Sequence, residues 1–88
     1  MRSESKESEE LLRAVGALVR DSRRHRGLTQ KQLAKLADVD RSFIIGIEKG
    51  KRNVSMDVID RLARSCGFKV EITFLPAFPP DADDSQPD

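Results

Sequence analysis

Hydrophobic side chains recur every three or four residues through most of the chain, and this spacing predicts amphipathic helices. Four runs show it, at residues 8–26, 30–37, 41–49 and 56–66. After Gly67 the period falls to two, because hydrophobic residues alternate with polar ones. A period of two is typical of a half-buried strand. We therefore expect an all-α bundle followed by one short strand at residues 68–75.

Polar residues suited to capping a helix precede each run, namely Ser8, Thr29, Asp40 and Ser55. Thr29 and Gln32 have the spacing of a capping box. Asp38 is expected to adopt a left-handed conformation in the turn between the second and third helices. The hydrophobic positions assign an inner face to each helix. These faces are expected to hold Leu11, Leu12, Val15, Leu18 and Val19; Leu33, Ala34, Leu36 and Ala37; Val39, Ile44 and Ile47; and Ile59, Leu62, Ala63 and Cys66.

A single predicted strand leaves its backbone donors and acceptors without a partner in the same chain. The simplest solution is that two copies of the chain pair this strand with each other. We therefore interpret residues 68–75 as a dimerisation element in which Val70, Ile72 and Phe74 face the partner. The alternative is an extended segment packed on the helices of its own chain.

The net charge of +1 conceals an uneven distribution. Residues 1–10 carry a net charge of −2 and residues 76–88 one of −4, whereas residues 11–75 carry +7. A basic folded segment is typical of proteins that bind nucleic acid, although charge by itself is equally compatible with a solvated surface. We expect a flexible N-terminus at residues 1–7, one DNA-binding domain at 8–67, and a disordered, proline-containing acidic tail at 76–88.

The chain of 88 residues is expected to form a single small domain whose marginal core favours association with a second copy. One cysteine excludes an internal disulfide and suits a reducing compartment. The polar N-terminal residues lack the apolar stretch of a signal peptide, and the chain has no run of membrane-spanning length. We therefore expect a cytoplasmic protein that does not enter a membrane.

Three stretches together resemble the Cro/C1-type (Xre) helix-turn-helix family over roughly residues 12–67. They are GLTQKQLA at 27–34, VDRSFI at 39–44 and IEKGK at 47–51. The resemblance implies a bundle like that of the lambda repressor, in which the third helix enters the major groove of DNA. It also implies a homodimer on a palindromic operator, with half-sites about 34 Å apart.

The resemblance further implies roles for individual residues. Base-reading positions correspond to Arg41, Ser42, Ile45 and Gly46, and an arginine can donate two hydrogen bonds to guanine. Phosphate-binding positions correspond to Thr29, Gln30, Lys31, Lys51, Arg52 and Asn53. A structural ion pair corresponds to Arg23 and Glu48. The chain departs from the family pattern at Asp38, Ile45 and Gly46, so the operator sequence does not follow from it. For Gly46, close approach to DNA and simple drift remain open as explanations.

A domain of this type followed directly by one short strand is similar to the HipB-type antitoxins. That similarity implies a repressor that regulates its own operon and binds a HipA-type kinase toxin. The alternative is a stand-alone transcriptional regulator of a phage or of a restriction system. The apolar strand and the acidic tail favour the antitoxin, and the tail is also compatible with a role in solubility.

The residues that could support catalysis are sparse, and we expect no enzymatic activity. His25 is the only histidine and lies at a basic helix end. Cys66 occupies the inner face of a helix, where a small core residue is expected. Asp57 and Asp60 have no nearby histidine or cysteine, so they do not indicate a metal site. No glycine-rich phosphate loop is present, and no cofactor is expected.

Overall fold

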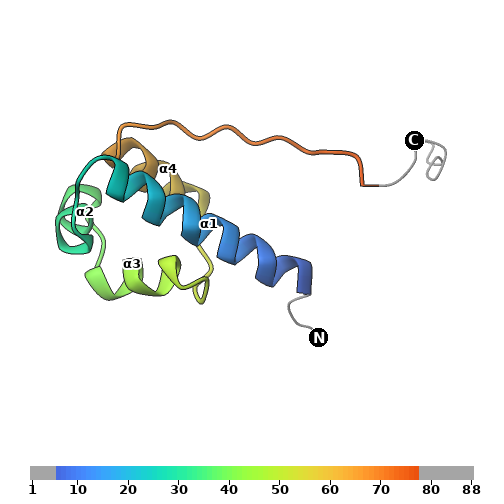
Figure 1. Cartoon of the computed structure of the whole chain (residues 1–88), viewed down its shortest axis with the longest axis horizontal. Coiled ribbons are helices and arrows are strands. Elements are labelled where there is room, and N and C mark those ends of the chain that lie inside the picture. Colours follow the sequence, from blue (N-terminus) through green and yellow to red (C-terminus); the bar gives the residue numbers. More distant parts are fainter. Residues whose placement is uncertain (1–5, 78–88) are drawn as a thin grey trace.

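The computed structural model describes residues 6–77, and within that range the chain forms four helices (Figure 1). They are α1 (Lys6–His25), α2 (Gln30–Ala37), α3 (Arg41–Glu48) and α4 (Met56–Ser65). The predicted helical architecture is thus confirmed. The predicted start of the first helix at Ser8 is wrong, because Lys6 and Glu7 already belong to α1. The rest of the expected flexible N-terminus, and residues 78–88 of the expected acidic tail, lie outside the described residues.

The predicted caps of the three later helices are confirmed. The Thr29 hydroxyl accepts a hydrogen bond of 3.0 Å from the Gln32 amide, and the Gln32 side chain accepts one of 2.8 Å from the Thr29 amide. These reciprocal bonds satisfy two helix donors that would otherwise lack partners. Asp40 and Ser55 cap α3 and α4 through their own side-chain oxygens. Asp38 has φ 58°, which is the left-handed conformation expected in the turn.

The core lies where the four helices meet. It consists of buried Val19, Leu33, Ala34, Ala37, Ile44, Ile47, Leu62 and Cys66. Leu11, Leu18 and Leu36, which were assigned to the inner faces, are instead 66%, 66% and 55% exposed. The assignment fails because the other helices cover only a narrow side of each of these two helices. The core residues are Val19 on α1 and Leu33, Ala34 and Ala37 on α2.

Helix α1 passes very close to the C-terminal end of α3 at Gly16. A Cβ atom at this position would collide with the carbonyl oxygen of Ile47 and would lie 3.0 Å from that of Glu48. The absence of a side chain therefore allows the two backbones to approach. This packing fixes the position of α3, which carries the predicted base-reading residues.

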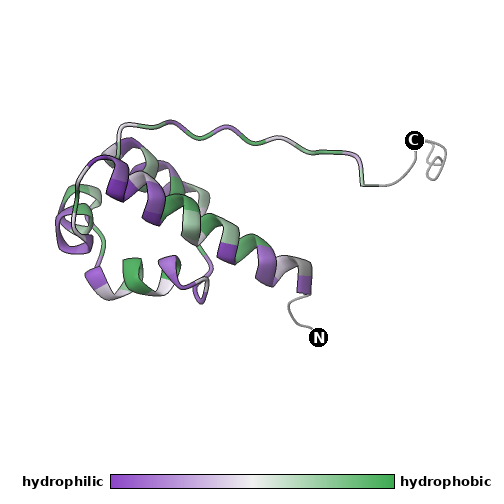
Figure 2. Ribbon diagram, in the orientation of Figure 1, coloured by the Kyte–Doolittle hydropathy of each residue, from purple (hydrophilic) through white to green (hydrophobic). Residues whose placement is uncertain are grey.

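The strand predicted over residues 68–75 is not formed within residues 6–77. The segment is extended and leaves the bundle at the end of α4 (Figure 1), and hydrophobic and hydrophilic residues alternate along it (Figure 2). A strand requires a neighbour with which to form a hydrogen-bond ladder, and none of the described residues provides one. Ile72 and Phe74 are 57% and 92% exposed, so the segment is not packed on its own helices either. Phe68 does contact the bundle, with its ring centroid 5.8 Å from that of His25.

Among residues 6–77, no helix combines the length and the hydrophobicity that crossing a bilayer requires.

Candidate nucleic-acid interface

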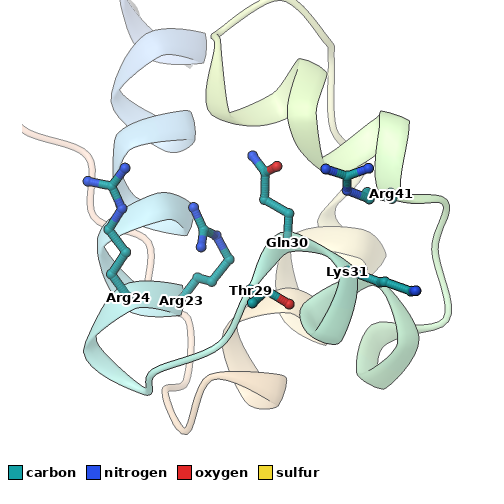
Figure 3. A pocket seen from close by; sticks show the side chains of 6 residues that line it. All are labelled: Arg23, Arg24, Thr29, Gln30, Lys31 and Arg41. Carbon is teal, nitrogen blue, oxygen red and sulfur yellow. The ribbon is translucent and has the colours of Figure 1, made fainter.

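An open hollow lies where the end of α1 meets the N-termini of α2 and α3 (Figure 3). It is lined by Arg23, Arg24, Thr29, Gln30, Lys31 and Arg41. Arg24 and Arg41 lie on opposite sides, with Arg23 and Gln30 between them (Figure 3). Four of the six lining residues are cationic. The hollow therefore concentrates positive charge beside the exposed end of α3.

Arg23 and Glu48 form a nearly buried, bidentate ion pair. The Nε–Oε2 distance is 2.7 Å and the Nη2–Oε1 distance is 3.0 Å, and the two side chains are 10% and 6% exposed. Arg23 Nη1 also donates to the carbonyl of Leu28 at 2.9 Å. The hydrogen bond to Glu48 raises the pKa of the Arg23 guanidinium, while burial opposes the increase. Arg23 thus remains cationic and serves to hold α1 against α3.

Gln30 joins this pair from the first residue of α2. Its Nε2 atom donates to Oε1 of Glu48 over 3.1 Å. The Gln30 side chain, which was expected to bind a phosphate, is thus hydrogen-bonded to the last residue of α3. Thr29 is similarly engaged in its capping box. Three helices are tied together at one carboxylate, which sets the angle between α2 and α3.

The predicted base-reading residues lie along α3. Arg41 and Ser42 are exposed, whereas Ile45 and Gly46 are half-buried. The Ser42 hydroxyl donates to the Asp40 carboxylate, which also accepts from the Ser42 amide at 3.2 Å. The first turn of α3 is thereby ordered, and the Arg41 side chain projects beside the cationic hollow (Figure 3).

The other end of α3 also carries cations. Lys51, Arg52 and Asn53 are exposed in the loop that follows. Lys51 and Asn53 line a second hollow together with Glu9, Leu12, Arg13, Lys49 and Gly50. Arg13 and Lys49 were not among the predicted residues, although both contribute to the positive charge of the region. Cationic side chains consequently flank both ends of the helix expected to enter the groove.

Arg61 is a further residue that the sequence pattern did not reveal. It lies on α4, and its Nη1 donates to the carbonyl of Ala37 at 2.9 Å and to that of Asp38 at 3.4 Å. Both carbonyls belong to the end of α2 and the turn before α3. Only an (i, i+4) pair with Asp57 was visible in the sequence, and that spacing gives no indication of a contact with the turn.

The residues considered for catalysis have other positions in the structure. Cys66 is buried in the core, and burial raises the pKa of its thiol, which disfavours the nucleophilic thiolate. His25 is exposed beside Phe68. Within the described part of the chain, no cluster of three or more histidine, cysteine or acidic residues has the arrangement of a metal site.

Comparison with known families identifies the family to which this arrangement of helices belongs. Residues 19–72, which include the end of α1 and all of α2, α3 and α4, match the family described as helix-turn-helix. The chain belongs to this family. The predicted Cro/C1-type helix-turn-helix resemblance is thus confirmed. The finer resemblance to HipB-type antitoxins is not shown, because the similar proteins are general helix-turn-helix regulators and restriction-modification controllers.

One similar curated protein is an uncharacterised HTH-type transcriptional regulator from Methanothermobacter thermautotrophicus. It is 42% identical over 50 residues, which cover 57% of this helix-turn-helix chain and 72% of that protein. Among solved structures, the restriction-modification controller protein C.AhdI from Aeromonas hydrophila is 38% identical with a TM-score of 0.66. The match covers 68% of this chain and 91% of C.AhdI.

A second controller was solved with DNA. A point mutant of C.Esp1396I, bound to its highest affinity operator site, is 30% identical to this helix-turn-helix chain. Its TM-score is 0.63, and the match covers 67% of this chain and 78% of the controller. This helix-turn-helix chain is therefore similar, over two thirds of its length, to a protein whose structure was solved on its operator.

Proposed function

We propose that this protein binds a DNA operator by inserting α3 into the major groove and thereby regulates transcription. The observation that carries the proposal is the arrangement of cations around α3, whose first residues Arg41 and Ser42 are exposed. Arg41 and Lys31 lie at one end of α3, and Lys49 and Lys51 lie at the other. Lysines in these positions bind the phosphates that flank a groove, while exposed side chains of the helix, Arg41 among them, read base edges. The similarity to C.Esp1396I, which was solved on its operator, supports DNA binding.

A second copy of the chain would complete the binding unit. A twofold dimer presents two α3 helices to successive major grooves, about 34 Å apart, on a palindromic site. We assign the dimer contact to residues 68–75, where Val70, Ile72 and Phe74 lie on one side of an extended segment. Exposed apolar side chains and unpaired backbone groups both favour pairing with an identical segment.

The test begins with selection of preferred sites from a library of random duplexes, followed by affinity measurements on the selected and a scrambled duplex. Arg41→Ala is expected to weaken binding to the selected duplex by about 1–3 kcal/mol and to leave binding to the scrambled duplex nearly unchanged. An equal loss on both duplexes would reassign Arg41 to a phosphate. Selection that yields no preferred sequence would contradict the proposed function.

An antitoxin of the HipB type is a second candidate, favoured by the exposed apolar segment after α4. A segment of this kind suits a protein partner as well as a second copy. Affinity capture of the N-terminally tagged chain from its own cells distinguishes the candidates. Stoichiometric recovery of a kinase-like protein would establish the antitoxin, and recovery with DNA alone would establish a stand-alone regulator.

A further inference from the structure

Gly46 occupies the middle of α3, where glycine is less favourable than alanine by about 1 kcal/mol. The structure gives a reason for its presence. A Cβ atom at position 46 would lie 2.5 Å from Cγ of Arg52 and 3.3 Å from its Cδ. The space that an alanine methyl group would need is thus filled by the Arg52 side chain.

The charged end of the same side chain is held by an aromatic ring. The central guanidinium carbon of Arg52 lies 4.8 Å from the ring centroid of Phe43. A cation within about 6 Å of a ring face is attracted by the electrons of the ring. Phe43 and Gly46 are three residues apart and therefore neighbours on one side of α3. Arg52 consequently folds back from its loop and lies along the helix, although it remains exposed to solvent.

This placement leaves the guanidinium able to read DNA. The guanidinium carbon lies over the Phe43 ring, and a guanidinium that stacks on a ring by its flat face keeps the N–H donors at its edge free. Two such donors match O6 and N7 of guanine in the major groove. Gly46, a predicted base-reading position on α3, is adjacent to the Arg52 side chain. An arginine free to move in the loop would instead be expected to contact phosphate alone.

We propose that Arg52, seated on α3 by Gly46 and Phe43, is a specificity-determining residue that reads a guanine in the operator. The proposal rests on the proposed DNA-binding function and changes the role expected for Arg52, which was phosphate binding. Arg52 thus supplements the base-reading residues of α3, although it belongs to the loop that follows the helix.

Substitution by alanine and by lysine separates base reading from phosphate binding. Arg52→Lys keeps the charge but loses the planar pair of donors. Both Arg52→Ala and Arg52→Lys are expected to weaken binding to the selected duplex by roughly 5- to 100-fold relative to the scrambled duplex. Lys51→Ala is the matched control, and it should weaken binding to both duplexes equally. Wild-type discrimination in Arg52→Lys would overturn the proposal.

A double-mutant cycle tests whether the absence of a side chain at Gly46 lets Arg52 lie along α3. Gly46→Ala should displace Arg52 and reduce discrimination, and the same change in an Arg52→Ala background should cause no further loss. Gly46→Ala should also raise the melting temperature more in that background than in the wild type, because the methyl group then has room. Additive losses of discrimination would show that Gly46 contacts DNA directly, and they would contradict its role in positioning Arg52. The melting comparison requires no DNA.

The outcomes distinguish this proposal from the proposed function. If the wild-type protein binds a preferred duplex and both Arg52 variants keep its discrimination, only the role of Arg52 is contradicted. If no preferred duplex is found, both the proposed function and the role of Arg52 are contradicted.

Discussion

Glu48 receives hydrogen bonds from both helices that position α3. Arg23 approaches from α1 and Gln30 from α2, and all the bonds end on one nearly buried carboxylate. The ion pair was implied by family resemblance, and its geometry explains why the pair is needed. A buried charge is costly unless it is paired and hydrogen-bonded. Loss of the carboxylate would therefore leave the guanidinium of Arg23 without compensation.

Glu48→Gln is expected to lower the free energy of unfolding by about 3 kcal/mol, because one partner of a buried pair loses its charge. Chemical denaturation followed by circular dichroism measures the change. Asp60→Asn is the matched control, since Asp60 pairs with Arg64 on the exposed surface of α4. Its effect should stay within about 0.5 kcal/mol. Similar losses in the two variants would contradict the special role of Glu48.

The packing of α1 against α3 depends on the absence of a side chain at Gly16. The backbone atoms that a methyl group would meet belong to the last turn of α3 and are fixed by its hydrogen bonds. They cannot move aside as the end of a flexible side chain can. The position of α3 is therefore sensitive to a single methyl group at this crossing.

Gly16→Ala is expected to destabilise the protein by about 1–3 kcal/mol, the usual effect of overpacking. Helix propensity by itself predicts the opposite sign, since alanine is favoured over glycine. Ala14→Gly provides the comparison on an exposed position of the same helix, and it should cost about 1 kcal/mol through propensity alone. Thermal denaturation of both variants is the measurement. A more stable Gly16→Ala protein would show that α1 and α3 can separate at no cost.

The distribution of charge over the molecule governs its expected response to salt. Cations at both ends of α3 would release counterions from DNA, whereas the segment after α4 lies away from this surface. Affinity for any duplex should therefore fall steeply as the salt concentration rises.

Lys51→Ala is expected to weaken binding to all duplexes and to reduce the slope of log K against log salt by about 1. Lys69→Ala is the control, because it removes the same charge from the extended segment. Its slope should match that of the wild type. Binding titrations at several salt concentrations give both slopes. Equal slopes for Lys51→Ala and wild type would remove Lys51 from the phosphate contacts.

The proposed association of two chains can be tested at the scale of the whole molecule. Phe74→Asp is expected to shift the protein towards monomer, because a charge would have to be buried in the paired segments. Sedimentation over a range of concentrations measures the mass. Thr73→Asp adds the same charge on the opposite side of the segment and should leave the dimer intact. A dimer that survives Phe74→Asp would place the interface elsewhere.

Local interactions made the helices predictable from the sequence. The caps at Thr29, Asp40 and Ser55 use bonds that span two or three residues. Hydrophobic periodicity located the helices, but it overestimated the inner faces at Leu11, Leu18 and Leu36. Periodicity shows which side of a helix is apolar, whereas burial depends on what lies against it. Family resemblance supplied Arg23 with Glu48, which periodicity alone would not have paired.

The sequence by itself determined where the four helices lie to within a few residues, the caps of the three later helices and the turn at Asp38, because each depends on neighbouring residues. The tertiary structure alone decided which distant groups meet. Arg61 reaches the end of α2, 24 residues earlier in the chain, Gly16 lies against the end of α3, and Arg52 folds onto Phe43. Residues 68–75 show the same division, since an alternating pattern favours an extended backbone but a strand forms only beside a partner.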